Sequence, residues 1–237
     1  MEHSIIPPRI PLPNISVIIP TLNEAPQLAQ CLKPLIGVVG EIIIADGGSS
    51  DDTLSIAKNY GCKVIAAPRG RGQQLRAGAT ATTKPWLLFL HADTILDDRW
   101  SQAVSQFIMA SHHQKKVAAF GYKNDLPGLS AWLLEKLVMM RSHLGLVYGD
   151  QGLVIERSYY TQLGGYGELV IMEDIEFCQR IGRRNIVIVS AFALTSGRRY
   201  KQRGILLRSL RNLICLCLYF VGVPVETIKK LYGTGSS

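Results

Sequence analysis

Ile15-Ser-Val-Ile-Ile19 opens the part of the chain that decides its fold, because this short β-branched run stops at Pro20 and predicts a buried strand. A helix is expected to follow over about 25–35. The same order repeats along the chain, with strands expected at 41–45, 63–66 and 86–90, and with helices after the second and third strands. Strand-loop-helix units at this spacing predict a mostly parallel sheet covered by helices on both faces.

Unusual polar residues follow each of these strands. They are Asn23 and Glu24 after the first strand, Asp46 after the second, Arg69 and Arg71 after the third, and Asp93 after the fourth. Because parallel strands end at the same edge of a sheet, we expect these side chains to converge on one crevice there.

The second half of the chain is less regular. Apolar residues at helical spacing predict a helix within 129–147, and a strand is expected at 153–155. Residues 172–181 are expected to form a helix with acidic residues in its first turn, followed by a last strand at 186–189. Residues 1–14 contain four prolines and are expected to be an irregular lead-in.

The composition fits one α/β domain with a tail. The chain has 237 residues, of which 47% are hydrophobic, and this excludes a disordered or fibrous protein. The net charge is +8, yet the residues after 196 include eight basic and one acidic side chain and therefore carry +7 of it. Such a cationic tail indicates phosphates or an anionic membrane surface as partner, and nucleic acid is not expected because the body of the chain has no matching basic face.

Two further features concern the setting of the protein. The five cysteines have no metal-ligand or disulfide spacing and are expected to be reduced packing residues of a cytoplasmic protein, and no signal peptide is visible. Residues 213–225 are apolar but number only 13, whereas a membrane span needs about 20. This run is therefore expected either to lie in a membrane interface, as a peripheral contact, or to be a core or homodimer-interface helix.

Four motifs follow one another along the chain: Pro20-Thr-Leu-Asn-Glu24, Asp46-Gly-Gly-Ser-Ser-Asp51-Asp-Thr53, Leu90-His-Ala-Asp93 and Glu173-Asp174. In this order they resemble the signature of the inverting, non-processive glycosyltransferases of family two, which have the GT-A fold. The resemblance covers residues 15 to about 200. It implies a Rossmann-like α/β domain over 15–200, with a nucleotide-binding half (15–95) and an acceptor half (96–200), followed by a basic and apolar helical tail (201–237).

The resemblance implies a nucleotide-diphosphate sugar as donor, with a UDP- or GDP-sugar favoured. Thr21, Glu24, Asp46 and Asp51 would contact the nucleoside, although Asp51 also fits a helix cap in a glycine-rich turn. Either Arg69 or Arg71, helped by Gln73, would neutralise the diphosphate.

The resemblance also implies a divalent metal, Mn²⁺ or Mg²⁺, held at Asp93, with Ala92 and Asp93 against the donor. The family usually has Asp-x-Asp here, whereas this chain has His91-Ala92-Asp93. His91 is therefore a second candidate ligand, and an imidazole ligand would favour Mn²⁺. The other interpretation is that His91 is a hydrogen-bonded histidine with a structural role.

On the acceptor side, the resemblance assigns the general base to Asp174, with Glu173 beside it, and makes Asp150 and Gln151 acceptor contacts. An acid pair at a helix start is the other interpretation of Glu173 and Asp174. Arg198 or Arg199 would close over the diphosphate or face a membrane.

The sequence therefore predicts a metal-dependent, inverting transfer of a sugar to a hydroxyl or lipid-phosphate acceptor. Two other functions stay open: a non-catalytic nucleotide-binding module of the same fold and a nucleotidyltransferase. The acidic loop Pro20–Glu24 after the first strand is unsuited to a nucleoside triphosphate and disfavours the latter.

Overall fold

A computed structural model of the chain describes residues 9–111, 114–125, 128–169, 171–195 and 205–232. The first half contains β1 (Leu12–Thr21), α1 (Ala25–Leu32), β2 (Val39–Asp46), α2 (Thr53–Asn59), β3 (Lys63–Ala66), α3 (Arg71–Thr80) and β4 (Trp86–Phe89). The second half contains β5 (Thr94–Leu96), α4 (Trp100–Ala110), β6 (Val117–Asn124), α5 (Leu129–His143), η1 (Gly149–Gln151), β7 (Leu153–Glu156), α6 (Arg157–Gln162), α7 (Glu173–Ile181), η2 (Arg183–Asn185), β8 (Ile186–Thr195), α9 (Ile205–Phe220) and α10 (Val225–Tyr232).

The described strands form one sheet in the order β3-β2-β1-β4-β7-β6-β8-β5. β1 pairs in parallel with β2 and with β4, and β2 pairs in parallel with β3. β7 runs antiparallel to β4, with Phe89 opposite Leu153. The loop that enters β7 therefore lies beside the carboxyl end of β4, and both halves of the chain meet at one edge of the sheet. The predicted α/β class with a mostly parallel sheet is confirmed.

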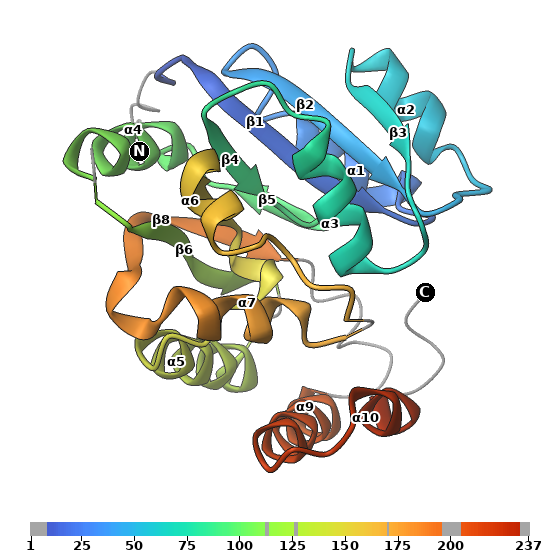
Figure 1. Cartoon of the computed structure of the whole chain (residues 1–237), viewed down its shortest axis with the longest axis vertical. Helices are drawn as coiled ribbons and strands as arrows, with labels where there is room; N and C mark the ends of the chain where they lie inside the picture. The colour runs from blue at the N-terminus through green and yellow to red at the C-terminus, as the bar shows by residue number, and fades with distance from the viewer. Residues whose placement is uncertain (1–8, 112–113, 126–127, 170, 196–204, 233–237) are drawn as a thin grey trace.

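Helices cover both faces of this sheet, as Figure 1 shows. Alternate residues of β1 point to opposite sides, so Val17 and Ile19 belong to one core cluster and Ile18 to the other. The first cluster includes side chains of α1, α2 and α4, and the second includes side chains of α3, α6 and α7. Burial of these β-branched strands between helices fixes the carboxyl edge on which the polar residues lie.

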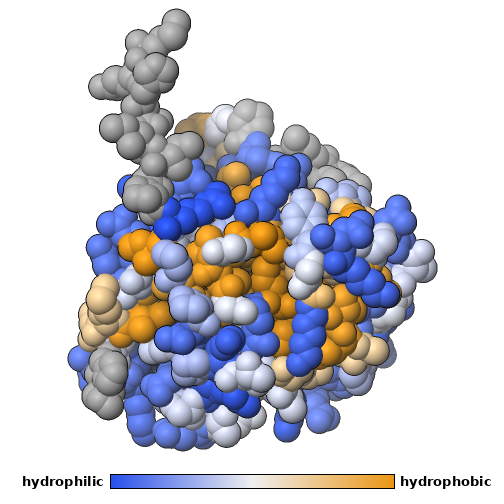
Figure 2. Space-filling model, turned by 90° about the horizontal axis from the view of Figure 1, so that it is seen from above, coloured by the Kyte–Doolittle hydropathy of each residue, from blue (hydrophilic) through white to orange (hydrophobic). Residues whose placement is uncertain are grey.

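Helices α5, α9 and α10 lie along the lower edge of the molecule in Figure 1. Figure 2 views the opposite side, from above, and shows hydrophobic side chains gathered in the middle of that face with hydrophilic ones around them. Within the described residues, no helix is both long and apolar enough to cross a membrane. Cys31, Cys178 and Cys215 are buried, as expected of packing residues, whereas Cys217 on α9 is exposed.

Candidate active site

The ends of β1 and β2 are joined by one buried carboxylate. Asp46 Oδ1 accepts hydrogen bonds from the hydroxyl of Thr21 at 2.9 Å and from the hydroxyl of Ser49 at 2.5 Å. Its Oδ2 accepts from the backbone N–H groups of Gly48 and Ser49, both at 2.8 Å. Burial raises the pKa of Asp46, but these hydrogen bonds outweigh burial and hold the pKa below its ordinary value. Asp46 is therefore an ionised and rigidly held acceptor.

The loop after β1 is pinned to the loop after β2. Asn23 adopts a left-handed backbone (φ 55°), and its side-chain oxygen accepts from the N–H of Ser50 at 2.9 Å. The N–H of Glu24 donates to the hydroxyl of Thr53 at 2.8 Å. Asp51 accepts from the N–H groups of Thr53 at 3.0 Å and Ala25 at 3.1 Å. Although burial raises the pKa of Asp51, its hydrogen bonds with Thr53 and Ala25 leave that pKa lowered. Asp51 therefore fixes these two loops to each other.

A buried residue outside the motifs, Gln74 of α3, supports the same edge. Its Nε2 donates to the carbonyl oxygens of Thr21 at 2.7 Å and Ala45 at 2.8 Å. A Cβ on Gly47 would lie 3.1 Å from this nitrogen, so the glycine allows the amide to reach both strands. The resemblance implies Gln73, not Gln74, as a residue that contacts the donor. Gln74 could have been found from its position one turn into a helix that begins beside the strand ends.

The segment after β4 meets the loop before β7 at Gly149. A Cβ on Gly149 would lie 2.2 Å from His91 Nε2, so the imidazole rests directly against this glycine. The N–H of Gly149 donates to Asp174 Oδ2 at 2.7 Å. Three segments that are distant in sequence therefore meet at the edge where β4 and β7 are neighbours. They contain His91, Gly149 and Asp174.

Asp150 lies between several of the predicted residues. Its side chain is 25% exposed, and within the described part of the chain its Oδ1 has no hydrogen-bond donor. Burial, with the nearby charges of Asp174 and Asp93, raises the pKa of Asp150 to about 6, while Arg141 and Arg71 act to lower it. Asp93 and Asp174 are therefore close enough for their charges to raise the pKa of Asp150, and we call these three residues the acidic cluster.

Arg141 of α5 contacts the loop of residues 148–151. The sequence motifs do not include this arginine. Its guanidinium lies 3.2 Å from the centroid of the Tyr148 ring, donates to Gln151 Oε1 at 3.2 Å and lies 3.7 Å from Asp150 Oδ1. Gln151 is buried, and its Nε2 donates to the carbonyl of Phe120 at 3.0 Å. The amide of Gln151 thus contacts the body of the protein, and its contact with an acceptor stays a prediction.

Glu173 and the basic loop after β3 also meet. A Cβ on Gly72 would lie 3.3 Å from the Cβ of Glu173, so the start of α3 packs against the start of α7. Burial and the neighbouring Asp174 raise the pKa of Glu173, whereas Arg71 acts to lower it. Arg71 is half-buried beside these acids, while Arg69 is exposed.

The remaining predicted residues differ in how far the structure describes them. Ala92 is buried. Arg198 and Arg199 lie outside the described residues. Among the residues that are described, no group of three or more His, Cys, Asp and Glu side chains is arranged to hold a metal ion by itself.

Sequence comparison identifies relatives over part of the chain. The model of Glycosyl transferase family 2 matches residues 16–149, more than half of the chain. An uncharacterized glycosyltransferase of Rickettsia felis is 33% identical over 111 residues, which cover 46% of this chain and 39% of the relative. A PGL/p-HBAD biosynthesis glycosyltransferase of Mycobacterium bovis is 38% identical over 94 residues, covering 35% of this chain and 37% of the relative. The matches thus span well under half the length of these relatives.

Solved structures share the fold. Glucosyl-3-phosphoglycerate synthase of Mycobacterium tuberculosis, solved with Mn²⁺, UDP and glucosyl-3-phosphoglycerate, has a TM-score of 0.59 at 23% identity, covering 91% of this chain and 81% of that one. S. aureus TarS 1-349 has a TM-score of 0.59 at 16% identity, covering 92% of this chain and 69% of that one. These likenesses show the GT-A fold, and the family model carries the classification. The chain belongs to glycosyl transferase family 2.

Proposed function

We propose that this chain transfers a sugar from a nucleotide-diphosphate sugar to a hydroxyl or lipid-phosphate acceptor, with inversion at the anomeric carbon. One observation carries the proposal. Asp174 accepts a hydrogen bond from the N–H of Gly149 at 2.7 Å, and the charges of Asp174 and Asp93 both act on Asp150. We assign the acceptor proton to Asp174 and the metal to Asp93, and their shared electrostatic interaction with Asp150 supports this pairing.

The donor would bind along the carboxyl ends of β1, β2 and β4. Ionised Asp46, with Thr21 and Glu24 beside it, offers acceptors for a base N–H and ribose hydroxyls. The half-buried Arg71 supplies a cation for the diphosphate. The mycobacterial synthase of similar fold was solved with UDP, which supports a UDP-sugar, and a GDP-sugar is the alternative to test.

The residues present fit a divalent metal that the substrate helps to hold. Asp150 Oδ1 is buried without a hydrogen-bond donor among the described residues, and crowded carboxylates of this kind suit a cation. Asp93 would ligate the metal and His91 is the second candidate; together they fit Mn²⁺ or Mg²⁺ with further ligands from phosphates. When bound, the metal neutralises charge on the departing diphosphate. Mn²⁺ in the mycobacterial synthase supports this assignment.

The chemical step assigns the acceptor proton to Asp174. As its carboxylate takes that proton, the acceptor oxygen forms a bond to the anomeric carbon and the bond to the diphosphate oxygen breaks on the opposite side. Displacement from the far side inverts the configuration, and the nucleoside diphosphate leaves with the bonding electron pair. Glu173 and Asp150 would orient the acceptor, while Arg71 stabilises the leaving group.

The first experiment measures donor binding and turnover separately. Thermal shifts with UDP, GDP, CDP and dTDP, each with Mn²⁺, Mg²⁺ or chelator, identify the donor, because a ligand at 100 times its dissociation constant stabilises by about 2.7 kcal/mol. Asp174→Asn is expected to keep this shift and to lose sugar transfer. Unchanged turnover in Asp174→Asn would refute the assignment of the base.

A second candidate function is a nucleotide-binding module without transferase activity. His91, at the position where the family usually has an aspartate, is the feature that motivates it. It predicts a nucleotide shift that neither metal strengthens and no release of nucleoside diphosphate from any sugar donor. Release of pyrophosphate from a nucleoside triphosphate would instead identify a nucleotidyltransferase.

The cationic tail supports a lipid-linked or membrane-bound acceptor, reached by peripheral contact through 201–237. A cytoplasmic location and a homodimer are further parts of the prediction. If removal of residues 205–237 leaves binding to anionic liposomes unaltered, the tail contact is refuted.

A further inference from the structure

Helix α5 is apolar on two sides. Leu134 and Val138 are buried and pack with Tyr122 of β6. On the far side, apolar residues are 45–79% exposed and form what we call the α5 stripe: Leu129, Trp132, Leu133, Leu137, Met140 and Leu144. Steps of three or four residues connect Leu129, Trp132 or Leu133, Leu137, Met140 and Leu144, and such steps keep side chains on one face of a helix. The exposed face of a helix is normally polar, so an apolar stripe of this length indicates a surface that is covered in use.

Cations lie within the α5 stripe and at its C-terminal end. Lys136 lies within it, with Nζ 5.6 Å from the centroid of the Trp132 ring. At the end of the helix, a Cβ on Gly145 would lie 2.8 Å from the Cβ of Arg183, so η2 adjoins α5. Lys116 Nζ donates to the carbonyl of Arg184 at 2.7 Å, and the side chains of Arg183 and Arg184 are exposed.

Acidic side chains do not cancel this charge. Glu135 is the only acidic residue of α5, and its Oε1 accepts from the backbone and side-chain amides of Asn124, both at 3.1 Å. This carboxylate is therefore turned toward β6. Asp125 is exposed, but it lies before the first turn of the helix. The α5 stripe thus combines aromatic and aliphatic side chains with one lysine within it and two exposed arginines at its C-terminal end.

We propose that the α5 stripe docks on an anionic lipid surface. Apolar side chains with tryptophan enter the boundary between headgroups and acyl chains, while lysine and arginine attract anionic headgroups. A symmetric dimer through the same stripe would bring Lys136 of each copy, which lies within the stripe, toward Lys136 of the other, and charge opposes that arrangement. The inference goes beyond the proposed function, because docking needs no sugar transfer.

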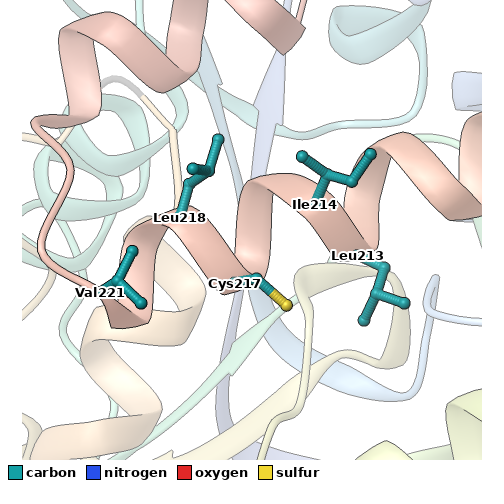
Figure 3. A pocket seen from close by; sticks show the side chains of 5 residues that line it. All are labelled: Leu213, Ile214, Cys217, Leu218 and Val221. Carbon is teal, nitrogen blue, oxygen red and sulfur yellow. The ribbon is translucent and has the colours of Figure 1, made fainter.

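A second exposed apolar surface lies in the C-terminal part of the chain. The exposed Leu213, Ile214 and Cys217 of α9 and the exposed Val221 just after it line a shallow apolar pocket together with Leu218 (Figure 3). Helix α9 lies at the same lower edge of the molecule as α5 (Figure 1). In addition, Arg141 on α5 contacts the loop of Asp150. Helix α5 therefore carries both the α5 stripe and the arginine that contacts the loop of the acidic cluster.

Co-sedimentation of the full chain with vesicles tests the proposal without any activity assay. The chain is expected to sediment with phosphatidylcholine vesicles containing phosphatidylglycerol, and to remain in the supernatant with phosphatidylcholine alone. Binding should weaken as salt is added. No sedimentation with the anionic vesicles would overturn the proposal, whatever the outcome of the transfer assays.

Paired variants separate α5 from other surfaces. Leu137→Ser with Met140→Ser is expected to weaken binding about tenfold, whereas Met109→Ser, a methionine equally exposed on α4, should leave it unchanged. Arg183→Gln with Arg184→Gln should weaken it about fivefold for each cation removed, and Lys33→Gln with Lys58→Gln serves as the charge control. Binding that is lost in Lys229→Gln with Lys230→Gln but kept in the α5 variant would assign docking to the tail and overturn the proposal.

Trp132 reports docking directly. Its fluorescence is expected to shift to the blue with anionic vesicles and to be quenched by lipids brominated in the acyl chain, and Trp132→Phe should remove that quenching. Trp132 unquenched in a vesicle-bound sample would overturn the proposal. A second copy of the chain is the alternative partner of the α5 stripe, and sedimentation velocity tests for it. If the chain does not bind vesicles and forms a dimer that Met140→Ser dissociates, the stripe is a dimer interface and the proposal is overturned.

Discussion

The carboxylate of Asp174 accepts a hydrogen bond from the backbone N–H of Gly149 at 2.7 Å, and Gly149 itself lies against the imidazole of His91. This contact joins α7, the loop before β7 and the segment after β4. A change at Gly149 therefore acts on the candidate base and on the candidate metal site together.

Gly149→Ala is expected to lower nucleoside diphosphate release at least about tenfold, because its Cβ would lie 2.2 Å from His91 Nε2 and must displace the ring. The position does not have a left-handed backbone, so the fold should tolerate alanine. Steady-state rates with and without Mn²⁺ provide the measurement. In the double variant with His91→Ala, the two losses should not add, and strictly additive losses would contradict the contact.

Asp46→Asn is expected to weaken nucleotide binding and to reduce the free energy of unfolding by about 1–3 kcal/mol, because an amide cannot accept all of the hydrogen bonds that reach Asp46. The pKa of Asp46 is lowered in the folded protein, so its contribution to stability is present above 3.8 and is lost as the pH falls below that value. Urea unfolding at neutral and acidic pH should show the difference between wild type and variant shrinking in acid. A constant difference would count against this role.

Asp150→Asn is expected to change stability in the opposite sense. The pKa of Asp150 is raised from 3.8 to about 6, so the folded protein is favoured below 3.8 and loses that advantage as the pH rises through about 6. The variant should therefore gain on the order of 1–3 kcal/mol over wild type between these limits. Urea unfolding across this range measures it, and Asp52→Asn, at an exposed position, is the matched control. A variant whose stability falls with pH as steeply as that of wild type would contradict the prediction.

Arg141→Met is expected to reduce the free energy of unfolding by about 2–4 kcal/mol, since Asp150 would lose its cationic neighbour and Tyr148 its stacked guanidinium. Lysine should restore only part of this stability, because an ammonium cannot stack on the ring and also donate to Gln151 in the same plane. Thermal unfolding of the three proteins gives the comparison. Full rescue by lysine would show that charge alone matters.

The first half of the fold could be predicted because its strands are uninterrupted β-branched or leucine-rich runs between turn residues. β6 could not, since Ala118, Ala119 and Gly121 break any strand pattern, and pairing with β7 and β8 decides its conformation. α4 carries buried residues at helical spacing, namely Trp100, Ala103, Val104 and Phe107, and that pattern could have found it. β5 has only three residues and depends on its pairing with β8.

The same distinction applies to the site. Asp46, Asp150 and Asp174 lie in short motifs, so the sequence could mark them as a set. Gln74 and Arg141 lie on helices whose patterns indicate packing, and only the folded chain brings Arg141 against Tyr148 and Gln151. Roles that depend on the opposite face of a helix leave little trace in a linear motif.

The antiparallel pairing of β4 with β7 has a mechanical consequence. The segment of His91 leaves β4 where the loop of Gly149 enters β7, and Phe89 and Leu153 are register partners just inside that edge. Backbone hydrogen bonds of the sheet therefore set how the candidate donor side and the candidate acceptor side are aligned. Because a one-residue slip in this ladder would turn every side chain of β7 to the opposite face, the register of the sheet itself fixes the relative positions of these candidate site residues.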